Sequence, residues 1–89
     1  MKHYKITVSG KVQGVFYRQT TLEIAKQRGV KGSVKNETNG NVTIEVEGTL
    51  EQLEKFVAWC KKGSTRAIVS DVKVEEGEIK YYSSFEIIR

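Results

Sequence analysis

The order of two hydrophobic periodicities along this chain constrains its fold more than any other feature. Apolar residues recur at every second position in some segments, which is typical of half-buried strands, and at every third or fourth position in others, which is typical of helices. Alternation covers residues 4–9, 30–35, 41–47, 67–74 and 85–88, and helical spacing covers residues 18–28 and 49–62. The chain is therefore predicted to run strand, helix, strand, strand, helix, strand, with a fifth strand at the end.

Turn and capping residues support these elements. The Asn39-Gly40 pair lies between two alternating segments and predicts an antiparallel hairpin, because both residues tolerate positive φ. Thr49 and Gln52 have the spacing of a capping box, and Gly29 follows the first helix as a C-cap. The apolar phase shifts at Ser70-Asp71, which predicts a β-bulge. The second helix carries its expected apolar face at Leu50, Leu53, Phe56, Val57 and Cys60.

This element order predicts an α+β fold of the ferredoxin-like type, a split β-α-β sandwich. We expect an antiparallel sheet of four to five strands with two helices on one face. The chain has 89 residues, which is the size of one compact domain. Residues 1–89 are therefore predicted to form a single domain.

The composition excludes several kinds of active site. The chain has one cysteine and one histidine, so it offers neither a His/Cys metal cluster nor a Ser-His-Asp triad. We expect no metal and no other cofactor. Cys60 falls on the apolar face of the second helix and is predicted to be a core residue, whereas His3 is expected to be exposed and incidental. The net charge of +4 suits an anionic ligand.

No segment of the sequence suggests membrane insertion. No apolar run approaches the ~20 residues needed to span a bilayer. The first residues lead directly into the alternating segment without an apolar signal sequence. We therefore expect a cytoplasmic protein with no membrane partner.

The segment Gly10–Arg18 is the most informative for function. It joins a strand to a helix, and such a junction gathers backbone N–H groups beside the positive end of the helix dipole. Gly10 and Gly14 permit a tight chain path and close approach of a ligand. A cation such as Arg18 in the first helical turn is unfavourable by roughly 0.3–1 kcal/mol, because it lies at the positive end of the helix dipole. A bound anion between the cation and the helix end removes this cost. The alternative interpretation of Arg18 is a solvated surface arginine. The loop is not a Walker P-loop, because the GxxxxGK(S/T) pattern is absent.

The segment Val12–Arg18, which reads VQGVFYR, closely resembles the acylphosphatase signature. A second element, Gly32–Asn36 followed by Asn39-Gly40, is similar to the strand-and-turn motif of the same family at matching spacing. The resemblance covers essentially all 89 residues. Two departures concern packing only: Ser33 stands where many relatives carry tryptophan, and residues 63–66 lack a proline often found there.

The resemblance implies a metal-independent hydrolase that cleaves acyl phosphates into a carboxylate and inorganic phosphate. Arg18 would bind the phosphoryl group, and Asn36 would orient the attacking water. The backbone N–H groups of the loop would help to bind the phosphate, from Gln13, Gly14, Val15, Phe16, Tyr17 and Arg18. Taken alone, Asn36 also fits a turn-forming asparagine at a strand end. The loop and Arg18 favour the catalytic interpretation.

Two alternatives belong to other functional classes. A non-catalytic, acylphosphatase-like phosphate-binding module would keep the loop without turnover. An RNA-binding ferredoxin-like domain would carry aromatic residues on a central strand, but residues 41–47 have none and include Glu45 and Glu47. We therefore expect a small-molecule substrate, no nucleic-acid partner and a monomer. No residue of the motif indicates a particular acyl group.

Overall fold

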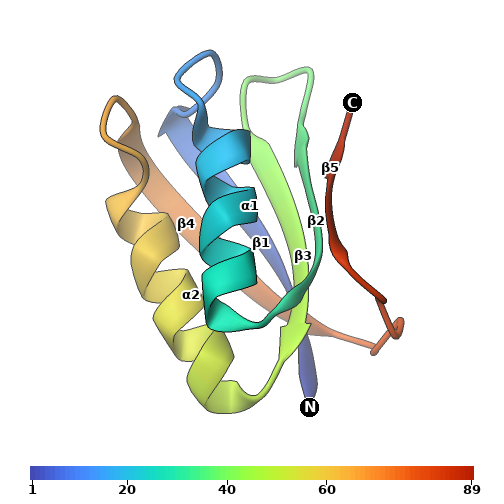
Figure 1. The fold of residues 1–89 in the computed structure, drawn as a ribbon. Coiled ribbons are helices and arrows are strands. Elements are labelled where there is room, and N and C mark those ends of the chain that lie inside the picture. The colour runs from blue at the N-terminus through green and yellow to red at the C-terminus, as the bar shows by residue number, and fades with distance from the viewer.

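The computed structural model describes residues 1–89 as two layers, in which two helices pack on one face of a five-stranded sheet (Figure 1). In chain order the elements are β1 (Lys2–Lys11), α1 (Tyr17–Arg28), β2 (Lys31–Asn36), β3 (Val42–Gly48), α2 (Leu50–Lys62), β4 (Ile68–Gly77) and β5 (Phe85–Ile88). Every element expected from the periodicities is present, and the α+β class is confirmed. Neither helix is long and apolar enough to cross a membrane.

The sheet is mixed, which corrects the prediction of an antiparallel sheet. Its strand order is β4-β1-β3-β2-β5, and every neighbouring pair is antiparallel except β2 and β5, which are parallel. Because β4 and β5 lie at opposite edges, the segment 78–84 crosses from one edge to the other and β5 then runs in the direction of β2 (Figure 1). The last residues of β5 consequently lie beside the last residues of β2.

The core lies between the helices and one face of the sheet. Fully buried apolar side chains are Ile6, Val8, Val34, Val42, Ile44 and Val46 from the strands, Ala25 from α1, and Leu53, Phe56 and Cys60 from α2. Cys60 is thus a core residue, as predicted. The apolar face of α2 begins at Leu53 and not at Leu50, because Leu50 opens the helix at the surface and is 46% exposed.

The predicted turns and caps are confirmed. Thr49 Oγ1 accepts from the Gln52 N–H at 3.2 Å, and Gln52 Oε1 accepts from the Thr49 N–H at 2.9 Å, which completes the capping box. Gly29 ends α1 in the left-handed conformation. Asn39-Gly40 lies in the connection between antiparallel β2 and β3. The register between β1 and β4 shifts so that Ser70 is the extra residue of a bulge.

His3 is buried, which corrects the prediction of an exposed histidine. It lies opposite Glu47 in the β1–β3 register, with Nδ1 2.8 Å from a Glu47 carboxylate oxygen and Nε2 3.1 Å from a Glu45 oxygen. The backbone N–H groups of Lys80 and Tyr82 donate to the same Glu47 carboxylate. The crossing segment 78–84 thus covers this part of the sheet, and no local sequence pattern predicts that crossing. We call these five residues the His3–Glu47 cluster.

The two carboxyl groups of this cluster are stabilised in their charged form. The hydrogen bond from Lys80 Nζ to Glu45 lowers the pKa of that carboxyl below its usual value. Burial alone would raise the pKa of Glu47, but hydrogen bonds from the Lys80 backbone N–H, His3 and the Tyr82 backbone N–H outweigh it and lower that pKa. The cluster therefore fastens the crossing segment to β1 and β3 through ionised carboxylates.

Candidate active site

A pocket of about 270 Å³ opens where the β1–α1 loop meets the last residues of β2 and β5. Figure 1 places these segments at one end of the sheet. The lining residues are Val12, Gly14, Phe16, Tyr17, Arg18, Gln19, Asn36, Ile87 and Arg89. Both residues predicted to carry the chemistry, Arg18 and Asn36, are therefore in one pocket although they are far apart in the sequence.

The β1–α1 loop turns through left-handed backbone conformations. Gly14 has φ 71° and Phe16 has φ 60°. Phe16 is the N-cap of α1, yet no side chain caps the helix and its first turn contains no acidic residue. The first backbone N–H groups of a helix have no intrahelical acceptor. The N–H groups at this end of α1 are therefore available to an anion in the pocket.

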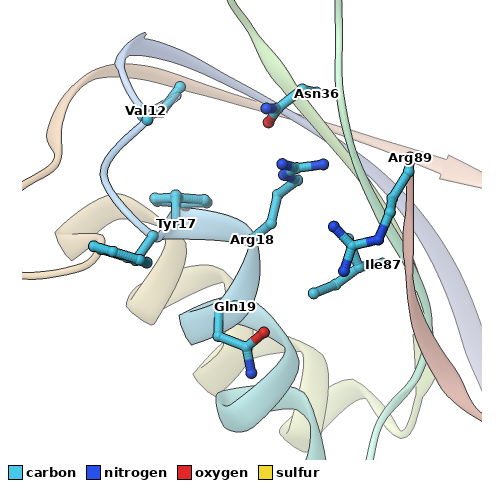
Figure 2. A pocket seen from close by; sticks show the side chains of 9 residues that line it. Val12, Tyr17, Arg18, Gln19, Asn36, Ile87 and Arg89 are labelled. Carbon is cyan, nitrogen blue, oxygen red and sulfur yellow. The ribbon is translucent and has the colours of Figure 1, made fainter.

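Arg18 brings a positive charge to the same place. It lies in the first turn of α1, is partly exposed and forms no salt bridge within the chain. Figure 2 shows its guanidinium directed from α1 toward Asn36. An unpaired guanidinium beside the positive end of a helix dipole is stabilised by a bound anion. This placement supports the predicted anion site.

Asn36 supplies a polar oxygen without a partner. It is the last residue of β2, and its Oδ1 atom is buried without a hydrogen bond to any protein group. Buried polar atoms in folded proteins nearly always have a hydrogen-bond partner, so an exception in a pocket indicates a position for a ligand or a water. An amide oxygen accepts hydrogen bonds, which is the property needed to hold a water molecule.

Other residues of the predicted loop support its shape and do not line the pocket. Gln13 Nε2 donates to the carbonyl oxygens of Glu37 and Asn41, at 2.8 and 2.9 Å, and so joins the loop to the β2–β3 connection. Val15 is buried, and its carbonyl oxygen accepts from Ser64 Oγ at 3.2 Å. The side chains of Gln13 and Val15 are therefore structural.

Tyr17 contributes to both the pocket and the core. Its side chain is almost fully buried, and its hydroxyl donates to the Cys60 carbonyl oxygen at 3.0 Å. Burial raises the pKa of Tyr17 well above its usual range, and burial also raises the pKa of the Cys60 thiol to about 12. Cys60 is therefore protonated at neutral pH and does not line the pocket, so it is not a candidate nucleophile.

The sequence analysis missed four lining residues, Val12, Gln19, Ile87 and Arg89. Val12 and Gln19 directly flank the predicted loop of residues 13–18, so their sequence positions could have indicated that they line the pocket. Ile87 and Arg89 reach the pocket only because β5 lies beside β2. A strand's neighbour in a sheet is a tertiary property, which explains why periodicity alone did not find them.

The arrangement can bind a tetrahedral anion and present a water to it. An uncapped helix end and an arginine provide donors and charge, and Asn36 adds an acceptor. No three His, Cys, Asp or Glu side chains cluster in a way that could hold a metal ion. Fold and pocket together define a class: α+β sandwiches with a pocket at a strand–loop–helix junction, a place suited to binding an anion.

Comparisons with known proteins narrow this class. A family model described as Acylphosphatase matches residues 4–87. An acylphosphatase of Haloquadratum walsbyi is 43% identical over 84 residues, which cover 94% of this chain and 90% of that protein. The crystal structure of acylphosphatase from Bacillus subtilis has a TM-score of 0.97 and 37% identity, with both chains fully covered. Phosphate- and nucleotide-bound HypF has a TM-score of 0.93 and 31% identity, but only 12% of that larger chain is covered.

The chain therefore belongs to the acylphosphatase family. The resemblance inferred from VQGVFYR is confirmed, as is the ferredoxin-like α+β fold. The predicted acylphosphatase function and the assignment as a hydrolase are confirmed at the level of the family.

Proposed function

We propose that this chain hydrolyses the carboxyl–phosphate anhydride of acyl phosphates to a carboxylate and inorganic phosphate, without a metal ion or other cofactor. One observation carries the proposal. Arg18, at the uncapped start of α1, shares a pocket with the buried and partnerless Oδ1 atom of Asn36. The Arg18 guanidinium suits the phosphoryl oxygens, and the Asn36 Oδ1 atom suits a water molecule.

Arg18 and the loop bind the phosphoryl group. The guanidinium fork hydrogen-bonds two phosphoryl oxygens, and the backbone N–H groups of residues 13–18 bind the remaining charge. Negative charge on these oxygens is redistributed as the phosphoryl group is transferred, and fixed donors stabilise it without reorganising. This role is supported by the absence of any acidic residue in the first turn of α1.

Asn36 holds the attacking water in line with the bond to be broken. Its Oδ1 atom accepts a hydrogen bond from the water, whose oxygen attacks phosphorus while the bond to the acyl oxygen breaks. The departing carboxylate has a conjugate-acid pKa of about 4, so no general acid is required. The proton lost by the water passes to a phosphate oxygen of the substrate. A pH–rate profile that follows an enzyme group, and not the substrate, would contradict this last step.

Residues 1–89 act in this proposal as one catalytic domain and as a cytoplasmic monomer. The monomer is supported by the pocket, because residues of this one chain line it. The cytoplasmic location is supported by Cys60, the lone and buried cysteine, which leaves no intrachain disulfide. The alternative is a phosphate-binding module without turnover; the matched part of HypF shows that a domain of this fold also occurs within a larger protein. An RNA-binding role has less support, because β3 carries no aromatic residue.

The test is hydrolysis of benzoyl phosphate in the presence of a chelator. The native chain is compared with Arg18→Ala and with Arg28→Ala, which removes an exposed arginine in the last turn of α1. We expect turnover by the native and Arg28→Ala proteins and a large loss in Arg18→Ala. Folded native protein that binds phosphate without hydrolysing benzoyl phosphate would support the non-catalytic module.

The role of Asn36 is tested separately with Asn36→Ala. This variant is expected to lose kcat while still binding inorganic phosphate, because Arg18 and the loop are intact. Phosphate binding is measured by isothermal titration calorimetry, and kcat with benzoyl phosphate. Loss of phosphate binding together with kcat would show that Asn36 holds the phosphate and does not orient the water.

A further inference from the structure

The position of Arg89 follows from the register of β5. This strand runs parallel to β2, and Phe85, Glu86, Ile87 and Ile88 pair with Gly32, Ser33, Val34 and Lys35. The next residues in the same register are Asn36 and Arg89. The parallel pairing thus carries a second arginine to the edge of the pocket, beside the residue that faces the attacking water in the proposed function.

Arg89 and Ile87 form the wall of the pocket that lies away from the phosphate loop. Side chains two residues apart on an extended segment point to the same side, so both face the pocket. Figure 2 shows the Arg89 guanidinium on the β5 side of the pocket, near Ile87, and Arg18 reaching in from α1. Ile87 is half-buried against the core and offers an apolar surface on the β5 side of the pocket, beside the Arg89 guanidinium.

The pocket holds a second guanidinium besides the one assigned to the phosphoryl group. No acidic residue lines it, and neither Arg18 nor Arg89 forms a salt bridge within the chain. In the proposed function Arg18 and the helix amides bind the phosphoryl group. Arg89, on the opposite wall, is left facing the space into which the acyl part of the substrate would extend.

We propose that Arg89 is a specificity-determining residue that binds a second anionic group on the acyl part of the substrate. The preferred substrate class is then an acyl phosphate whose acyl group ends in a carboxylate or a similar anion. Carbon atoms of the acyl part would contact Ile87, which lines the same wall of the pocket as Arg89. This inference rests on the proposed function, because it takes Arg18 as the site of the phosphoryl group.

A guanidinium is well suited to this task. Its planar fork hydrogen-bonds a carboxylate at two points. Because Arg89 is exposed, water and salt screen the interaction and keep its contribution modest. We expect a preference of about twofold to fivefold in kcat/KM.

The test compares benzoyl phosphate with 4-carboxybenzoyl phosphate, in which a rigid ring prevents the added carboxylate from attacking the anhydride. The readout is the ratio of kcat/KM for the carboxylated substrate to kcat/KM for benzoyl phosphate. Arg89→Gln is expected to lower this ratio about twofold to fivefold, and Arg89→Lys is expected to restore part of it because the charge returns. Arg28→Gln, a matched change at the far end of α1, is expected to leave the ratio at its native value.

The outcomes separate this inference from the function on which it rests. Native values of kcat/KM for both substrates in Arg89→Gln would overturn the specificity role and leave the proposed hydrolysis standing. Equal losses on both substrates would also overturn it, because Arg89 would then act on the phosphoryl group common to both. Absence of benzoyl phosphate turnover by the native protein would refute the proposed function, and this inference with it.

Discussion

The pocket and the His3–Glu47 cluster lie toward opposite ends of the same sheet, and each is built around a buried polar oxygen. Glu47 has a complete set of partners: His3 and two backbone N–H groups from the crossing segment. Asn36 Oδ1 has no partner in the protein, and the helix end nearby has no cap. The His3–Glu47 cluster uses buried polar groups to hold the chain together, whereas the pocket leaves a buried polar atom without a partner.

This difference distinguishes structural from functional polar residues. A buried group with full hydrogen bonding stabilises a fold, whereas an unpaired buried acceptor costs about 1–3 kcal/mol. Such a cost is tolerated where a ligand or water completes the hydrogen bonds during function. Substitutions in the pocket should therefore affect activity more than stability, and substitutions in the cluster should do the reverse.

The largest effect is expected for Arg18→Ala. Removing the charged donor for the phosphoryl group should reduce kcat/KM for benzoyl phosphate about 10²–10³-fold, as for other fixed donors to a transition state. Because Arg18 is partly exposed and unpaired, the free energy of unfolding in urea should change by less than about 1 kcal/mol. A variant that keeps its activity but unfolds at much lower urea would place Arg18 among the structural residues.

Glu47→Ala is expected to have the opposite effect. It leaves His3 and two backbone N–H groups without their acceptor, and a buried donor left unsatisfied costs about 1–3 kcal/mol. Urea unfolding measures this loss, with Glu86→Ala as the control because Glu86 is exposed and unpaired. At temperatures where the variant is folded, kcat should stay within about twofold of the native value. A fall in kcat without a fall in stability would contradict the structural role assigned to Glu47.

Acid should weaken the His3–Glu47 cluster and with it the fold. The lowered pKa values of Glu45 and Glu47 favour folding when these groups are ionised, so their stabilisation is complete well above the usual value of 4.5. It is lost progressively as the pH falls below that value, through the lower pKa of the folded state. We expect the urea midpoint to drop between pH 6 and pH 3, and to drop less in Glu47→Gln. Equal slopes in both proteins would contradict this assignment.

The smallest of these effects is expected for Gln13, which belongs to the loop but acts structurally. Gln13→Ala removes two hydrogen bonds to the β2–β3 connection, which should cost about 1–2 kcal/mol. Gln13→Glu has nearly the same shape but places a charged acceptor against two carbonyl oxygens, so it should destabilise more. Both are measured by urea unfolding. If Gln13→Glu is as stable as the native protein, these contacts do not hold the loop.

Local signals predicted most of the fold. The Thr49 capping box, the bulge at Ser70 and the buried position of Cys60 depend on residues close in the sequence or on helical spacing. Leu50 is an exception, because a residue at the first turn of a helix can be exposed although it continues the apolar spacing. The order of elements predicted the layers, since each apolar face needs a partner to bury it.

Long-range pairing accounts for the features that local patterns did not predict. The parallel pairing of β5 with β2, the burial of His3 and the entry of Arg89 into the pocket all follow from the crossing of residues 78–84. No periodicity records which edge of a sheet the last strand joins. Arg18 and Asn36 were found in advance because a family motif carries them, whereas Arg89 lies outside that motif.

The most direct test of the division between a functional pocket and a structural His3–Glu47 cluster is a titration of the ¹⁵N-labelled protein with inorganic phosphate, followed by NMR. The division predicts saturable shifts at the backbone amides of residues 13–19, with shifts at the Asn36 side-chain amide and Arg18 Nε. Residues His3, Glu45 and Glu47 should keep their native shifts throughout. Saturable shifts centred on the His3–Glu47 cluster, or none at residues 13–19, would show that the phosphate site is not at the start of α1.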